Sequence, residues 1–325
     1  MTVGASTLPQ PLCAFDIRSD GQVLIVADIA SPIDQQDVVY RWLHFDLATA
    51  GLEEWCHVTL PPLAARALLA AKTRPHVENH EEGLFATFRG VNFNEGAELE
   101  DMVSLRLWMT DRLVVTVRRE RVFAMEDLAN QMRSHDAPPT PARLVARVTE
   151  HLVARIEQIS LDLELRTDQL EEAVYDNDSR DVTTLAPLRR SVIKLRRHIG
   201  PMTDALKSLA TIETVLIPKK LRHRLRDTAN RATRSVEEVH EVTDRLIALS
   251  QHVDLNNDTR LAHNGYVLSV IAAIFLPLGF LTGLFGVNVG GMPGVDSDLG
   301  FVILCVAMVV IGAFGYVILR WLRWF

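Results

Sequence analysis

The sequence predicts an α+β cytosolic domain, an α/β module followed by long helices, that continues into a two-span α-helical membrane domain. Three observations lead to this prediction. Strand-like segments alternate in the first part of the chain, apolar residues then recur at helical spacing, and two long apolar stretches follow. We place the three regions at residues 1–137, 138–262 and 263–325.

The α/β module is indicated by short runs rich in β-branched and apolar residues. We expect strands at residues 23–28, 84–89, 104–108 and 113–118, and a helix at residues 62–71. Pro138, Pro139 and Pro141 interrupt this pattern. A purely helical region therefore begins near this group of prolines.

Long helices are indicated in the second region by apolar residues at steps of three and four. The last such run begins at Pro218 and has neither proline nor glycine before Gly265. If it continues to Phe285, this helix is about 100 Å long at 1.5 Å per residue. Such a helix fits the stalk of a membrane protein. It also fits a membrane-anchored coiled-coil scaffold, so periodicity alone leaves both interpretations open.

Two membrane spans are expected at about residues 264–285 and 300–320, with an outer loop at 286–299. Residues 264–295 contain no charged side chain, and residues 300–319 form a second such stretch. Each stretch is long enough to cross the roughly 30 Å hydrocarbon core of a lipid bilayer. We therefore expect a multi-pass membrane protein.

The orientation follows from the charges beside the spans. Arg260 precedes the first span, Arg320 and Arg323 follow the second, and the loop between them holds only Asp296 and Asp298. Cationic residues remain preferentially on the cytoplasmic side of a membrane. Both termini are therefore expected in the cytoplasm, and the two aspartates outside, where they would attract cations.

Composition excludes several classes of function. The net charge of −7 provides no basic stripe for a nucleic acid, and an acidic body accumulates cations instead. The three cysteines are too far apart in the sequence for a zinc knuckle. Because the sequence contains no phosphate-binding loop, nucleophile elbow or HExxH segment, we expect no enzyme.

The exit of the first span is rich in glycine. Residues 283–294 contain five glycines, one proline and a single amide side chain, Asn288. Backbone carbonyls and an amide oxygen bind a cation without a fixed charge that would trap it. A tight turn between two apolar helices is the alternative interpretation.

Residues 280–288, FLTGLFGVN, and the following GMPG at 291–294 resemble the signature of the CorA superfamily of divalent-cation transporters. Within it, the chain is similar to the ZntB-like branch of zinc transporters, which has Gly-Val-Asn where the superfamily usually has Gly-Met-Asn. Segments 88–94, 101–103 and 116–119 resemble the cytosolic domain of the same branch. The likeness thus covers most of the chain.

This resemblance implies a CorA-like homopentameric funnel in the bacterial inner membrane, with Gly286, Val287 and Asn288 at the outer mouth. It implies Zn²⁺ as the transported ion, symport with protons, and no permanently bound cofactor. Gly294 stands where the magnesium transporters commonly carry an acidic residue, which weakens a magnesium interpretation. A less selective channel for Mg²⁺, Co²⁺ or Ni²⁺ remains the alternative within the family.

Helical steps back from Gly283 define one face of the first span, composed mostly of small residues and ending in a carboxylate. We expect this face to line the pore: Asp258, Ala262, Gly265, Ser269, Ala272, Leu276, Gly279 and Gly283. Close packing of helices is the alternative role for its small residues, and a solvated surface is the alternative for Asp258.

The first span offers neither cysteine nor histidine, the usual ligands of zinc. We therefore expect a hydrated ion that transiently meets Asn288 and Asp258. Proton-coupling groups would lie at the ends of the span, at His263, Asp258, Asp296 or Asp298. His76 and His80 lie near Glu78, but in an extended segment that does not favour a metal site.

Overall fold

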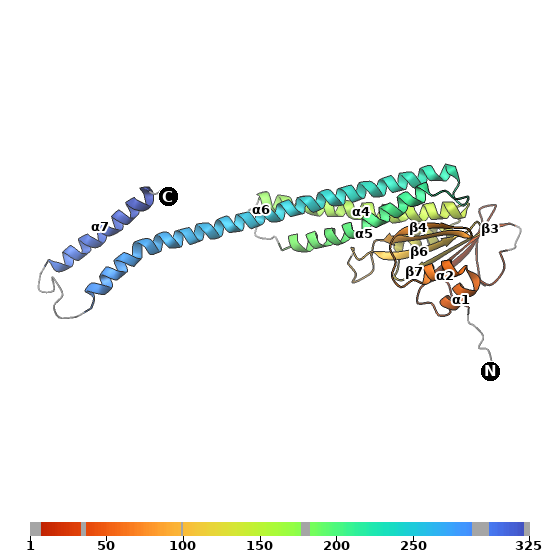
Figure 1. The fold of residues 1–325 in the computed structure, drawn as a ribbon, viewed down its shortest axis with the longest axis horizontal. Helices are drawn as coiled ribbons and strands as arrows, with labels where there is room; N and C mark the ends of the chain where they lie inside the picture. Colours follow the sequence, from red (N-terminus) through yellow and green to blue (C-terminus); the bar gives the residue numbers. More distant parts are fainter. Residues whose placement is uncertain (1–7, 34–36, 99, 177–182, 288–298, 322–325) are drawn as a thin grey trace, which may run out of the picture. The chain divides into compact units, whose positions relative to one another are not determined.

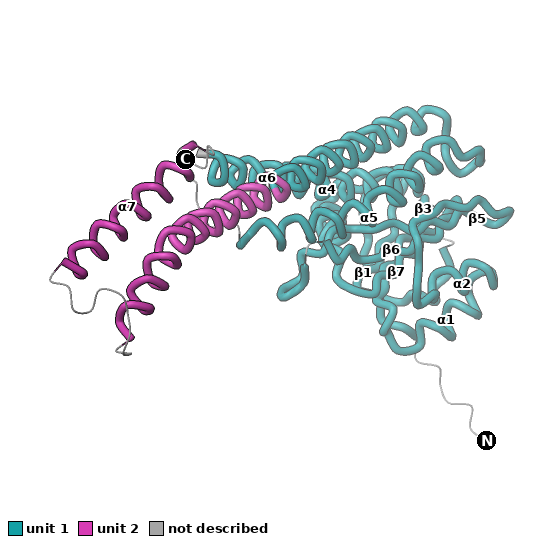
Figure 2. The backbone as a smooth tube through the Cα atoms, turned by 60° about the vertical axis from the view of Figure 1, so that its left-hand side comes forward, with its two compact units in different colours: residues 1–249 teal, residues 250–325 magenta. Residues whose placement is uncertain are grey.

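The computed structural model describes residues 8–33, 37–98, 100–176, 183–287 and 299–321. It separates into two compact units, residues 1–249 and residues 250–325, which Figure 2 distinguishes by colour. The first unit contains a β-sheet flanked by helices, and the second contains only helices.

The first unit is built on a seven-stranded sheet with the strand order β2-β1-β3-β7-β6-β5-β4 (Figure 1). The strands are β1 Cys13–Arg18, β2 Val23–Ile25, β3 Val38–Asp46, β4 His76–His80, β5 Gly83–Gly90, β6 Val103–Met109 and β7 Leu113–Arg118. Neighbouring strands are antiparallel except β3 and β7, which run parallel at the centre. The expected strands β5, β6 and β7 are confirmed, whereas β2 is shorter than expected.

One face of the sheet is covered by two short helices, α1 Leu52–Thr59 and α2 Pro62–Leu69 (Figure 1). Trp55, Cys56 and Leu68 from these helices join Phe45 and Trp108 of the sheet in one buried apolar cluster. Burying such large side chains supplies about 1.5–3 kcal/mol each, so this cluster anchors the module.

The opposite face is covered by helices α3 Phe123–Arg133, α4 Pro141–Asp176 and α5 Leu185–Thr211. Tyr40 on β3 donates a hydrogen bond of 2.7 Å to the carbonyl of Pro138, just before α4. A Cβ atom at Gly90, at the end of β5, would lie 3.0 Å from the Leu152 side chain of α4. Glycine therefore permits the close approach of this helix to the sheet.

A regular series of ion pairs joins α4 to the first part of α6, Lys219–Phe285. Arg224 pairs with Glu150 at 3.2 Å, Arg231 with Glu157 at 2.8 Å, and Arg245 with Glu171 at 3.0 Å. The partners in each pair are 74 residues apart, and successive pairs are separated by one or two heptads. A constant offset means that the two helices run in the same direction.

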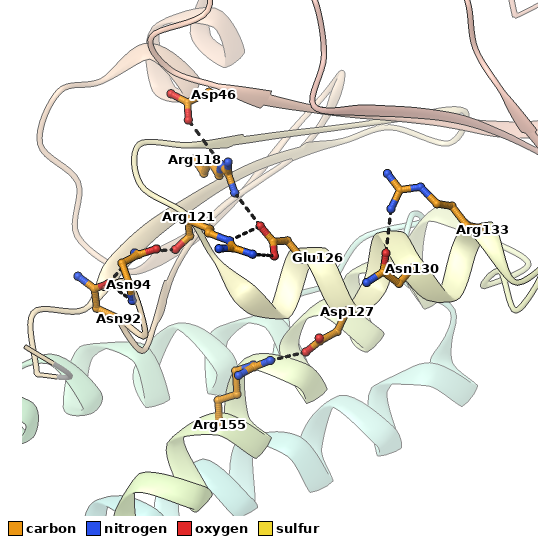
Figure 3. A network of polar contacts seen from close by, with 10 residues as sticks. All are labelled: Asp46, Asn92, Asn94, Arg118, Arg121, Glu126, Asp127, Asn130, Arg133 and Arg155. Atoms are coloured by element: carbon orange, nitrogen blue, oxygen red, sulfur yellow. Dashed lines mark hydrogen bonds and ion pairs between the residues drawn. The ribbon is translucent and has the colours of Figure 1, made fainter. Parts of the chain in front are cut away.

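A polar network fixes the turn between β7 and α3 (Figure 3). Glu126 accepts two hydrogen bonds from Arg121 and lies 3.6 Å from Arg118, which also approaches Asp46 at 3.5 Å. The hydrogen bonds from Arg121 are the largest cause of the lowered pKa of Glu126. Arg118 and Arg121 are therefore both neutralised by carboxylates.

The second unit contains the end of α6 and helix α7, Gly300–Trp321. Both helices contain an apolar stretch that is long enough, by length and composition, to cross a membrane. Helix α6 is continuous over 67 residues, which confirms the long helix expected from the sequence. Pro277 lies inside it and has no N–H to donate to the carbonyl of Ala273.

Candidate ion pathway

One side of α6 in the second unit is covered by α7. Along α6 this covered side consists of Val270, which is 7% exposed, and half-buried residues one turn apart on either side of it. These half-buried residues are Tyr266, Ile274, Leu278 and Leu281. A Cβ atom at Gly315 of α7 would lie 4.0 Å from the Ile274 side chain. The two candidate spans thus approach each other where Ile274 of α6 faces Gly315 of α7.

The small-residue face expected from the sequence lies roughly on the opposite side of α6, at 3.6 residues per turn. All eight residues of this face are exposed in the single chain: Asp258, Ala262, Gly265, Ser269, Ala272, Leu276, Gly279 and Gly283. Leu276, the largest apolar residue among them, is 77% exposed. Small residues on an uncovered side of a helix allow a molecule other than the chain itself to approach the helix backbone closely.

The glycines of this face are not used for packing within the chain. A Cβ atom added at Gly265, Gly279 or Gly283 would meet no atom within 4 Å. These small residues therefore do not bring α6 and α7 together within the single chain, as far as the described residues show their contacts. That alternative is excluded. Contacts with a further copy, or space for an ion, are the two remaining uses.

Polar groups on this part of α6 hydrogen-bond back to the helix. The Ser269 hydroxyl donates to the carbonyl of Gly265 at 2.8 Å. Because its hydrogen is used in this way, the oxygen keeps lone pairs on the exposed side that suit a hydrated cation.

The helix ends at Phe285, and Gly286 and Val287 follow it. The Gly286 N–H donates to the carbonyl of Thr282 at 2.9 Å, and a Cβ atom at Gly286 would lie 2.9 Å from the same oxygen. A side chain is therefore sterically disfavoured where the chain leaves the helix. Asn288, Asp296 and Asp298 lie outside the described residues.

Asp254 is a further candidate that the sequence reasoning missed. It is exposed and lies one helical turn before Asp258, on the same side of α6. Extending the predicted face by one more helical step of four residues, from Asp258 toward the start of α6, would have included Asp254. His263 lies instead on the side of Val270, away from the small-residue face. Asp254 and Asp258 are consequently the ionisable groups that this face presents at the end remote from Phe285.

The described residues contain no group of three or more histidine, cysteine or acidic side chains arranged to hold a metal ion. Cys305 is half-buried on α7. His76 and His80 lie on strand β4, the extended conformation expected for them, and each lies beside an aromatic ring in a tilted arrangement. His80 Nε2 lies 3.3 Å from Glu78, which pairs it locally.

Comparison with known proteins places this geometry in a family. The model of the CorA-like Mg²⁺ transporter protein family matches residues 37–321. The chain is 32% identical to the divalent cation transporter CmaX of Pseudomonas aeruginosa, over 87% of each chain. It is 29% identical to the zinc transport protein ZntB of Pectobacterium atrosepticum, over 86% of this chain and 88% of that one.

A solved structure shows the same fold. The structure of the full-length CmaX protein superimposes with a TM-score of 0.84 at 30% identity, and covers 97% of this chain and 98% of its own. The match includes both the sheet module and the two candidate spans, since nearly the whole chain is aligned. These relatives are transporters and not enzymes. The chain therefore belongs to the CorA-like Mg²⁺ transporter protein family.

Proposed function

We propose that this protein carries Zn²⁺ across a bacterial inner membrane as a homopentamer, in symport with protons. The observation that carries the proposal is the exposed small-residue face of α6, opposite the side covered by α7. Five copies arranged with this face toward a common axis would enclose a pore, and α7 would face the lipid. Small side chains on the axis leave room for a cation with its water shell.

The outer mouth would be formed by Gly286, Val287 and Asn288. Carbonyl and amide oxygens attract the hydrated ion without a full negative charge, so binding stays weak enough for release. A dehydrated zinc site is not proposed, because residues 264–287 contain neither cysteine nor histidine. Zinc is chosen over magnesium because of Gly294 and the likeness to zinc transport proteins.

Acidic rings would concentrate cations at both ends of the pore. Asp254 and Asp258 would form two rings at the cytoplasmic end, and Asp296 and Asp298 would form rings outside. Residues 264–287 carry no acidic, basic or histidine side chain, so proton coupling would use the groups at the ends. Asp258 and Asp254 suit this role better than His263, which lies on the other side of the helix.

A second candidate is a less selective channel for Mg²⁺, Co²⁺ or Ni²⁺. It is favoured by the family description and by the name of CmaX, which specifies divalent cations and not zinc. A coiled-coil scaffold, by contrast, has no support among these relatives.

Uptake of ⁶⁵Zn²⁺ into proteoliposomes, with and without an inward proton gradient and with excess Mg²⁺, tests the proposal. Gradient-stimulated uptake that Mg²⁺ barely inhibits is expected. Gradient-independent flux that Mg²⁺ blocks would favour the channel instead. The absence of any flux from assembled protein would contradict both. Chemical crosslinking of the purified protein should yield pentamers.

The role of the outer mouth is tested by Asn288→Ala in the same assay. We expect uptake to fall sharply while the pentamer survives, because the substitution removes only the amide group that is proposed to meet the ion. Asn256→Ala is the matched control, since it removes the same amide from an exposed position of α6 outside the small-residue face. Normal uptake by Asn288→Ala would remove this residue from the mechanism.

A further inference from the structure

A second candidate site lies in the first unit, remote in sequence from the spans. A cavity of about 620 Å³ opens beside the end of β5 and the start of β6. The segment 71–75 before β4, the residues after β7 and one side of α5 complete its walls. Its volume falls within the range of about 300–1,000 Å³ that is typical of small-molecule sites.

The walls of this cavity are strongly basic. Its lining includes five formally cationic side chains, those of Lys72, Arg74, Arg89, Arg119 and Arg197. Glu120 is the single carboxylate among the lining residues. The concentration of positive charge is opposite in sign to the net charge of −7 of the whole chain. Electrostatic attraction therefore favours an anion in this cavity.

These cations lack the partners that other arginines have. Arg118 and Arg121, on either side of the segment that holds Arg119, are neutralised by Glu126. Along α4 and α6, Arg231 and Arg245 are likewise paired with carboxylates. Among the residues that the structure describes, none of the five lining cations forms an ion pair. Their charge is thus available to a ligand.

A buried arginine outside the lining, Arg106, interacts electrostatically with two of the lining cations. Arg106 is 0% exposed, and its Nε and Nη1 atoms have no hydrogen-bond partner in the described structure. Burial, followed by the charges of Arg89 and Arg119, lowers the pKa of Arg106. Arg89 donates only to neutral carbonyls, those of Met102 at 2.8 Å and Thr73 at 2.9 Å. Mutual repulsion of three guanidinium groups is relieved when an anion binds beside them.

We propose that this cavity binds a soluble small polyanion that carries several phosphate groups. Arginine forks match phosphate oxygens in bidentate geometry, and the lining supplies four arginines and a lysine from four separate segments. No phenylalanine, tyrosine or tryptophan lines the cavity to stack on a base, so the phosphate groups and not a nucleoside are recognised. Binding here does not depend on which ion the spans carry.

Isothermal titration calorimetry of the full-length protein in detergent tests this site. Tripolyphosphate is the probe, orthophosphate and citrate are the comparators, and divalent cations are removed so that chelation makes no heat. We expect saturable binding of tripolyphosphate, one per chain, tighter than binding of either comparator. The double variant Arg119→Glu with Arg197→Glu should bind at least about tenfold more weakly, because two charge-assisted contacts become repulsive.

The control is Arg190→Glu with Arg196→Glu, which changes the net charge equally at two exposed positions of α5 outside the cavity. All four arginines are exposed, and size-exclusion chromatography and circular dichroism verify that each variant folds. Retained binding by this control, with loss in the cavity variant, supports the site. No saturable binding, equal binding by both variants, or equal loss in both would overturn it, as would tighter binding of citrate.

Discussion

The stability of the sheet module should depend on pH through a single buried histidine, His44 on β3. Its side chain is 4% exposed, and its Nδ1 lies 2.8 Å from the hydroxyl oxygen of Thr116 on β7. Nε2 has no hydrogen-bond partner in the described structure. Burial, followed by the charge of Arg118, lowers the pKa of His44 from 6.5 to about 3. The fold therefore keeps the imidazole neutral.

The sign of the effect follows from the two states. Below pH 6.5 the unfolded chain binds a proton at this histidine, whereas the folded chain does not until the pH approaches 3. The contribution of this neutral histidine to the free energy of unfolding is consequently present in full above pH 6.5 and is lost as the pH falls. Between about pH 7.5 and 5.0, this linkage alone removes about 2 kcal/mol from the free energy of unfolding. For a unit of this size that is roughly 4–8 °C in Tm.

Thermal melting of the full-length protein, followed by tryptophan fluorescence between pH 7.5 and 5.0, measures this loss. Trp42, Trp55 and Trp108 are buried in the sheet module and report its unfolding. His44→Asn keeps an amide near the Thr116 hydroxyl but removes the titration, so its Tm should fall by several degrees less than that of the unchanged protein. Carboxylates such as Glu126 contribute equally to the pH dependence of both proteins, so their contributions cancel in the difference between the two Tm changes. Parallel pH dependences would refute the reasoning.

Three further perturbations have defined outcomes. Asp16→Ala leaves Arg41, which is 3% exposed and bound to Asp16 at 2.7 and 2.9 Å, as a buried unpaired charge. It should lower the free energy of unfolding by about 3–5 kcal/mol, and a melting shift equivalent to less than about 1 kcal/mol would contradict this. The double variant Asp254→Asn with Asp258→Asn should raise the zinc concentration that gives half-maximal uptake. This increase should be largest at low salt, where charges are least screened. Unchanged uptake kinetics would exclude a role for these residues in attracting the ion. Gly286→Ala should reduce uptake and lower Tm, because its Cβ would lie 2.9 Å from the Thr282 carbonyl oxygen. Gly265→Ala, with open space around its Cβ inside α6, should not lower Tm, because alanine favours a helix more than glycine does. Equal melting of these two glycine variants would show that the helix exit tolerates a side chain.

Local sequence pattern was sufficient to predict a helix or strand wherever the segment itself has the residue spacing or composition typical of that element. The apolar spacing of residues 218–285 predicted a continuous helix, and α6 runs from Lys219 to Phe285. Strands β5, β6 and β7 are nearly all apolar or β-branched, and were found for that reason. Strand β3 was not among the strands named from the sequence, and its polar residues Arg41 and His44 find their partners only in the fold. Their partners, Asp16 and Thr116, lie 25 and 72 residues away in the sequence.

The sequence by itself determined the two spans, the small-residue face and the family signature, because these depend on composition and helical spacing over short distances. Only the tertiary structure decided which side of α6 is covered by α7, and hence that the small-residue face stays exposed. It also decided that Arg119 lacks a carboxylate partner while Arg118 and Arg121 have one. In sequence these three arginines are indistinguishable, because charge pairing depends on side chains that the fold brings together from distant segments.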